Sequence, residues 1–123
     1  MVRQGDIIKI NFSPQSGHEQ SGYRPAVIVS NDIFNKKAKL VMVCPITNTK
    51  NKFPMHICLD SRTKTTGVIL CEHVRTLDIE SRKFVKVEKL PKDILEEVIN
   101  MVCASVELIT QSEMSPASKL EKA

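Results

Sequence analysis

The most informative stretch of the chain is GHEQSGYRPAVIVSN, residues 17–31, in which a polar loop meets an apolar run. Its polar part combines two glycines with a histidine, a carboxylate, an amide, a tyrosine and an arginine. Glycine loosens such a loop, and Pro25 fixes φ where the next strand begins. Arg24 therefore stands between a loop and a rigid element, a favourable position for holding charge against a ligand.

The pattern of apolar and polar residues predicts short strands on both sides of this loop. Residues 7–12 alternate, with Ile8, Ile10 and Phe12 toward one face. Residues 26–30 form a continuous apolar strand, typical of the centre of a sheet that is covered on both faces. Further strands are expected at residues 40–44, 54–60, 68–77 and 83–87.

Two helices are expected between and after these strands. Asn31 and Asp32 offer a cap for a helical turn over residues 33–37. From Pro91 onward apolar residues recur at spacings of three and four, which predicts an amphipathic helix over residues 91–109. The sequence therefore predicts one domain, residues 1–110, that is mostly β with a C-terminal α-helix closing a bent sheet or barrel. Residues 111–123 are expected to be a disordered tail.

The charge is unevenly distributed along the 123 residues. Residues 1–90 carry 15 Lys and Arg against 8 Asp and Glu, whereas residues 91–123 carry 3 against 6. A basic body suits an anionic partner such as a nucleic acid, although it also describes an ordinary solvated surface. Neither a membrane-spanning run nor a signal peptide is recognisable, so we expect a soluble, cytoplasmic protein with no membrane partner.

The four cysteines contain no C-x-x-C pair and are expected to be reduced. One alternative is a metal site, because His56-x-Cys58 and Cys71-x-His73 each place two ligand types on one face of a strand. Nothing in the sequence fixes the pairing of these strands. We therefore expect neither a metal nor another cofactor.

Arg24 and Thr47 are the residues best suited to phosphate chemistry. A guanidinium can grip a phosphate with two parallel hydrogen bonds and stabilise charge that develops during phosphoryl transfer. The Thr47 hydroxyl can donate to a phosphoryl oxygen. Each also has a plainer interpretation, as a surface arginine and as a turn-capping threonine.

Several short motifs occur in an order that resembles the MazF/PemK toxins of bacterial toxin–antitoxin systems, from about Arg3 to Ile109. The loop motif and the P-I-T motif are the most specific of them. They are Gly5-Asp6-Ile7, Gly17-x-Glu19-Gln20-x-Gly22-x-Arg24-Pro25, Val29-Ser30-Asn31-Asp32 with Asn35, Pro45-Ile46-Thr47, Pro54-x-His56 and Val74-Arg75-Thr76-Leu77-Asp78.

The resemblance implies an SH3-like barrel of the CcdB/MazF type that works as a homodimer. It implies metal-independent cleavage of single-stranded RNA or mRNA, leaving a 2′,3′-cyclic phosphate and a 5′-hydroxyl, and neutralisation by a cognate acidic MazE-like antitoxin. Arg24 and Thr47 then occupy the catalytic positions, with Glu19 or His18 assisting. The residues expected to contact RNA are Gln20, Tyr23, Asn31, Asn48, His56, Glu72, His73 and Arg75.

One position departs from the family pattern, because His73 stands where relatives commonly have glutamine. An imidazole and an amide present different donors and acceptors, which predicts an altered cleavage motif or a pH-dependent preference. The alternative is that His73 packs in the barrel. Two other functions also remain open for the whole chain: a non-enzymatic CcdB-like toxin that binds gyrase, and an RNA-binding barrel without activity.

Overall fold

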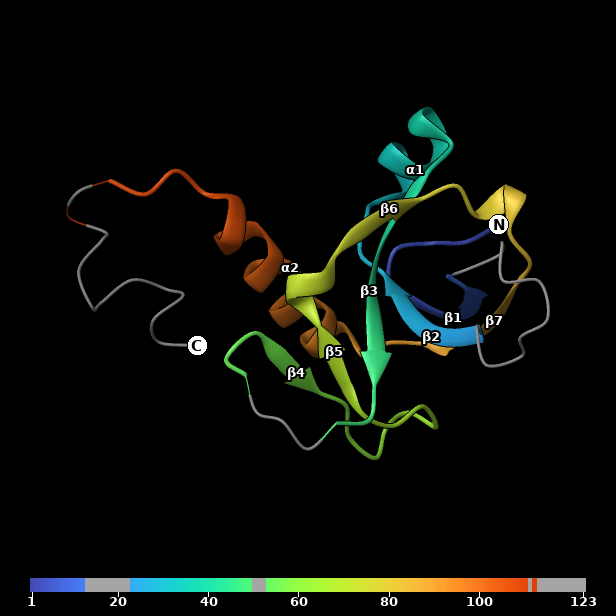
Figure 1. Cartoon of the computed structure of the whole chain (residues 1–123), viewed down its shortest axis with the longest axis horizontal. Coiled ribbons are helices and arrows are strands. Elements are labelled where there is room, and N and C mark those ends of the chain that lie inside the picture. The colour runs from blue at the N-terminus through green and yellow to red at the C-terminus, as the bar shows by residue number, and fades with distance from the viewer. Residues whose placement is uncertain (13–22, 50–52, 111, 113–123) are drawn as a thin grey trace.

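A seven-stranded antiparallel sheet organises the chain in the computed structural model (Figure 1). The structure describes residues 1–12, 23–49, 53–110 and 112. The strands are β1 (Asp6–Asn11), β2 (Tyr23–Ile28), β3 (Val41–Thr47), β4 (His56–Cys58), β5 (Val68–Leu70), β6 (Arg75–Leu77) and β7 (Phe84–Lys89). The helices are α1 (Asp32–Ala38) and α2 (Lys92–Val106), with 3₁₀ turns η3 (Cys71–His73) and η4 (Ile79–Ser81).

The strands lie in the order β4-β5-β3-β2-β1-β7, and β6 also pairs with β3. In the described part of the chain the outer strands β4 and β7 do not pair with each other, so the sheet is barrel-like but not closed. The predicted mostly β fold with a C-terminal helix is confirmed. The strand predicted at residues 26–30 is central and buried as expected, since it lies between β1 and β3, but it runs from Tyr23 to Ile28, so Arg24 lies within it and residues 29 and 30 follow it.

Two hydrophobic cores lie on opposite faces of the sheet, because successive strand residues point to opposite sides. The helix-side core takes Ile7, Val27, Cys44 and Ile46 together with residues of α2. The second core takes the alternate residues of the same strands. Its strand members are Ile8, Ile10, Ala26, Ile28, Val41, Val43 and Leu77.

The α2 helix covers the first of these faces. Ile94 and Val98 are buried in the helix-side core, and both lie on the apolar stripe predicted from the sequence. The helix ends at Val106 rather than at residue 109 as expected. The physical reason is lost packing: Val106 is 79 % exposed and Leu108 95 % exposed, so no core contact extends the helix.

The prediction of one long strand over residues 68–77 is wrong. Ile46 pairs with Ile69 and Val43 pairs with Arg75, so two residues of β3 stand opposite five of the partner segment. The extra residues form the η3 turn. Pro45 lies in the same interval of β3 and has no backbone N–H to give to a ladder, so continuous pairing is not available there.

The remaining boundaries differ from the predictions in smaller ways. β3 continues to Thr47 rather than ending at residue 44, and the strand expected at residues 54–60 forms only over His56–Cys58. The cap predicted for α1 is confirmed, since the Asn31 side chain accepts a hydrogen bond from the Phe34 backbone. The expected tail, residues 111–123, lies almost wholly outside the described residues, so the division at residue 110 stays a prediction. No helix of the described chain has the length and apolar character needed to cross a membrane.

Candidate functional site

Arg24 and Thr47 lie at the same end of two neighbouring strands. Ala26 of β2 stands opposite Pro45 of β3 in the antiparallel ladder. Arg24 precedes this pair by two residues and Thr47 follows it by two. Because residues two apart share a face, both side chains lie on the sheet face that carries the second core. The fold therefore brings the two candidate residues, distant in sequence, to one edge of one surface.

The exposure of these residues fits a surface site. Arg24 is exposed and pairs through its backbone with Ile10 of β1. Tyr23, the preceding residue, is 38 % exposed. Thr47 is half-buried at the end of β3, and Asn48 after it is exposed. The strands β2 and β3 thus hold Arg24 and Thr47 at the surface of the sheet.

A second group of candidate residues gathers around the η3 turn. His56 Nε2 lies 2.8 Å from a carboxylate oxygen of Glu72, and His73 Nε2 lies 3.8 Å from the same oxygen. The His73 side chain is 62 % exposed, so the alternative that it packs inside the barrel is wrong. The break in the predicted long strand is what turns Glu72 out of the sheet toward His56.

His56 has one nitrogen that the described residues leave unsatisfied. Its Nδ1 atom is buried and has no hydrogen-bond partner among them. Phe53 packs edge-on against the imidazole, with ring centroids 5.4 Å apart. Leaving a buried polar atom unbonded costs about 1–3 kcal/mol, so this nitrogen is a local energetic cost among the described residues.

Arg75 is held against an aromatic ring. Its guanidinium carbon lies 5.1 Å from the centroid of Phe12, a cation–π contact. Val43 pairs with Arg75, which puts the arginine on the same sheet face as Arg24 and Thr47. Sequence reasoning missed Phe12 and Phe53 as partners of site residues. The signal available was that each of these scarce aromatic residues borders a polar loop.

Asn31 lies away from this group. It follows β2 at the end opposite Arg24, and its side-chain oxygen caps α1 by accepting from Phe34 N at 2.8 Å. The structure therefore does not bring Asn31 together with Thr47. His18, Glu19 and Gln20 lie outside the described residues.

The cysteine and histidine positions do not assemble a metal site among the described residues, where no group of three or more His, Cys, Asp or Glu is placed to hold an ion. His56 pairs with Leu70 and Cys58 with Val68, while Cys71 is buried in the helix-side core. The hydrogen bond with Cys71, together with burial, raises the pKa of the Cys44 thiol well above its ordinary range. Cys44 therefore stays protonated and is a core residue.

Taken together, the fold and the surface define a small barrel-like β protein in which the ends of two neighbouring strands carry an exposed arginine and a half-buried threonine. A family model described as "PemK-like, MazF-like toxin of type II toxin-antitoxin system" matches residues 3–106. The chain belongs to this toxin family, as its motifs predicted.

Relatives with known names and structures agree with this assignment. Endoribonuclease MazF of Staphylococcus saprophyticus is 37 % identical, with 89 % of this chain and 95 % of that protein covered. Endoribonuclease PemK of Escherichia coli is 34 % identical, with coverages of 80 % and 77 %. A crystal structure of a MazE–MazF complex from Deinococcus radiodurans superposes with a TM-score of 0.74 at 27 % identity, covering 87 % of this chain and 96 % of that one.

Proposed function

We propose that this chain is the toxin of a type II toxin–antitoxin pair and acts as an endoribonuclease on single-stranded RNA, including mRNA. Two relatives with endoribonuclease activity in their names, each more than 30 % identical, support the activity. The observation that carries the assignment to residues is the placement of Arg24 and Thr47 at one end of neighbouring strands, on one face.

The proposed reaction needs little from the protein beyond charge stabilisation. The RNA 2′-hydroxyl attacks the adjacent phosphorus, the bond from phosphorus to the 5′-oxygen breaks, and a 2′,3′-cyclic phosphate forms. The proton lost by the 2′-hydroxyl is balanced by one gained at the 5′-oxygen, which leaves as a hydroxyl. Because the nucleophile belongs to the substrate, the protein has only to orient it and stabilise the charged phosphorane.

Arg24 and Thr47 take complementary roles in this scheme. A guanidinium keeps its proton in proteins, so Arg24 acts as the electrostatic stabiliser and donates two hydrogen bonds to phosphoryl oxygens. The Thr47 hydroxyl donates a further hydrogen bond. Glu19 or His18 assists, and the proton carrier is one of these two residues or Arg24 itself. The proposed RNA contacts are Gln20, Tyr23, Asn48, His56, Glu72, His73 and Arg75.

The proposed partners follow from the family. The crystal structure of MazE–MazF supports an antitoxin partner, which we propose to be an acidic MazE-like protein. A disordered acidic segment of that protein can lie over the basic surface and compete with RNA. We further propose a homodimer acting in the cytoplasm. The gyrase-binding and inactive-barrel alternatives gain no support, since both named relatives are endoribonucleases.

Incubation with a long mixed-sequence single-stranded RNA in EDTA tests the proposal. The purified protein should give discrete fragments whose 5′ ends accept a phosphate from a polynucleotide kinase without prior phosphatase treatment. Arg24→Ala should give none at the same concentration, and Thr47→Val should cleave on the order of 100-fold more slowly, with both keeping the wild-type melting temperature. Intact RNA with the wild-type protein overturns the proposal, and gyrase inhibition becomes the next assay.

A further inference from the structure

Gly67 packs against the backbone of Thr47 at the end of β3. Its φ is +118°, a conformation that residues with a Cβ rarely adopt. A Cβ at this position would collide with the carbonyl oxygen of Thr47 and lie 2.8 Å from its carbonyl carbon. It would also lie 3.1 Å from Oδ1 of Asn48. Only glycine therefore allows the two backbones to approach this closely.

The loop that ends in Gly67 is fastened to β7. The Glu88 carboxylate accepts hydrogen bonds from the backbone N–H groups of Lys64 and Thr65, at 3.0 and 2.8 Å. It accepts a third from the Thr65 hydroxyl at 2.7 Å. Burial alone would raise the pKa of Glu88, but these donors hold it below its usual range. The carboxylate is therefore charged at neutral pH and anchors the loop.

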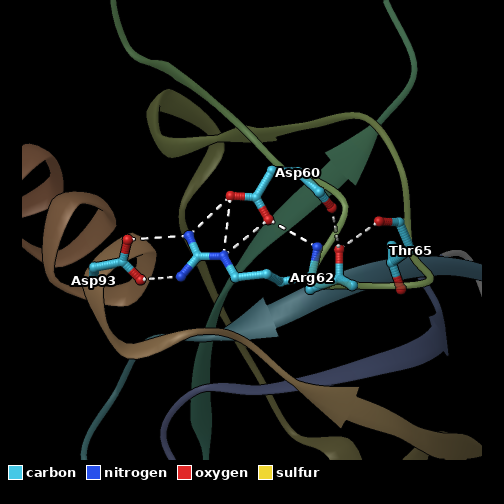
Figure 2. Close-up of polar contacts among 5 residues, drawn as sticks. Asp60, Arg62, Thr65 and Asp93 are labelled. Atoms are coloured by element: carbon cyan, nitrogen blue, oxygen red, sulfur yellow. Dashed lines mark hydrogen bonds and ion pairs between the residues drawn. The ribbon is translucent and has the colours of Figure 1, made fainter.

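The same loop is also tied to α2, as Figure 2 shows. Arg62 grips the Asp93 carboxylate with two hydrogen bonds, of 2.9 and 3.0 Å, from its two terminal nitrogens. It also donates to Asp60 at distances of 2.8 to 3.2 Å. Each ion pair is exposed and weak alone, but the paired geometry limits the freedom of the loop.

The last residues of this loop lie against Thr47 and Asn48. The backbone N–H of Leu59 donates to the Gly67 carbonyl at 3.0 Å and closes the loop. The Thr66 hydroxyl donates to Oδ1 of Asn48 at 3.3 Å. Val68, the next residue, pairs with Thr47. A segment fixed to both β7 and α2 thus ends in van der Waals range of the Thr47 backbone.

We propose that Gly67 is a positioning residue, which with the loop Asp60–Gly67 sets the placement of Thr47 and Asn48 for RNA cleavage. The activity part of this inference rests on the proposed function. A displacement of about 1 Å at a reacting group can cost on the order of 100-fold in rate, so a Cβ forced against the Thr47 carbonyl should act mainly on kcat. RNA affinity, which is spread over many contacts, should change little.

The test compares Gly67→Ala with Gly5→Ala. Gly5 also has a positive φ, +92°, but its Cβ would meet only the tip of the Leu95 side chain, at 3.1 Å, far from the site in the fold. Both variants suffer backbone strain, whereas only Gly67→Ala presses on Thr47. We expect Gly67→Ala to lower kcat on the order of 100-fold with KM little changed, and Gly5→Ala to stay within about twofold of wild type. Equal losses in both variants overturn the inference, because they report general strain.

A double variant shows whether Gly67 acts through Thr47. If it does, Gly67→Ala combined with Thr47→Val should be no slower than Thr47→Val alone. If the rate loss of the double variant instead equals the product of the losses in the two single variants, the inference is contradicted. Where Gly67→Ala does not fold, Glu88→Gln provides a second test, because it removes the charge and one of the two acceptor oxygens of the loop anchor without touching the site. kcat should then fall several-fold, and an unchanged kcat overturns the inference.

Nuclear magnetic resonance separates this inference from the proposed function. In Gly67→Ala, or in Glu88→Gln, the amide and methyl resonances of Thr47 should shift, and in Gly5→Ala they should not. Unmoved Thr47 resonances reject the inference whether or not RNA is cleaved. Shifted resonances in a protein that leaves all RNA intact support the positioning role and reject the proposed function alone.

Discussion

The polar residues at the two ends of the central strands, β2 and β3, have different roles. At the α1 end the side chains serve the fold. Asn31 caps the helix, Gln4 Nε2 donates to the Val29 carbonyl at 2.8 Å, and Asp32 accepts from the Gln4 backbone at 2.9 Å. These hydrogen bonds join the turn before β1, the residue after β2 and the start of α1, and they explain why this end is polar in sequence although it is structural.

At the other end the candidate site residues lie at the surface. Arg24 is exposed, Thr47 is half-buried and Asn48 is exposed, at the ends of rigid strands. Both ends look alike in sequence, since each is a short polar run next to an apolar strand. The difference lies in what the described residues bring to each end: the helix α1 at one, and the loop over residues 60–67 at the other.

The largest difference in RNA cleavage should come from substituting two arginines, Arg24 at one end of the strands and Arg3 at the other. Arg24→Lys keeps the charge but loses the planar pair of donors, so RNA cleavage should fall on the order of 100-fold. Arg3→Lys is the matched control. Arg3 makes one exposed ion pair with Asp32, 3.4 Å long, and such pairs are worth at most about 1 kcal/mol. Full activity in Arg24→Lys would mean that charge alone suffices at this end.

Two asparagines allow the same comparison with a smaller effect. Asn31→Ala removes a helix cap and should lower the free energy of unfolding by about 1 kcal/mol, with cleavage unchanged. Asn48→Ala should instead leave the free energy of unfolding unchanged and raise KM for RNA by up to about tenfold. The reason is that one hydrogen bond to a ligand is worth about 1 kcal/mol. Denaturant unfolding and initial rates check both. The comparison fails if Asn31→Ala impairs cleavage without loss of stability.

His73 should affect which RNA sequence is cut rather than how fast. The exposed imidazole beside Glu72 offers donors and acceptors unlike those of an amide. Sequencing the cleavage ends from His73→Gln and wild type, at pH 6 and pH 8, should reveal a changed preference of a few-fold at one base of the motif. An identical motif in both proteins at both pH values removes His73 from base recognition.

Local patterns predicted most of the sheet and the helix, because alternation and three-to-four spacing directly reflect burial on one face. They did not predict the η3 turn, since residues 68–77 are as apolar as an unbroken strand and the break depends on Pro45 of another strand. For the same reason the contact of Glu72 with His56 was not visible. Gly67 looked like a loop glycine, because the close approach of Thr47 is set by pairing between distant segments.

The smallest effect should appear at acid pH and belongs to the structural end. Asp6 is buried, 3 % exposed, and its carboxylate accepts from the Arg3 backbone at 2.7 Å and faces Lys86 and Lys89 at 3.4 and 3.2 Å. Burial alone would raise its pKa, but the Arg3 hydrogen bond and the two lysines hold the pKa below the usual value of 3.8.

A lowered pKa in the folded state means that the unfolded chain binds the proton more tightly. The stabilisation from Asp6 is therefore fully present above about pH 4 and is lost as the pH falls through the lower, folded-state pKa. Unfolding measured from pH 6 to pH 2 should show the wild type losing its advantage over Asp6→Asn below about pH 4. A constant difference between the two proteins across this range would show that Asp6 stabilises by packing rather than by its charge.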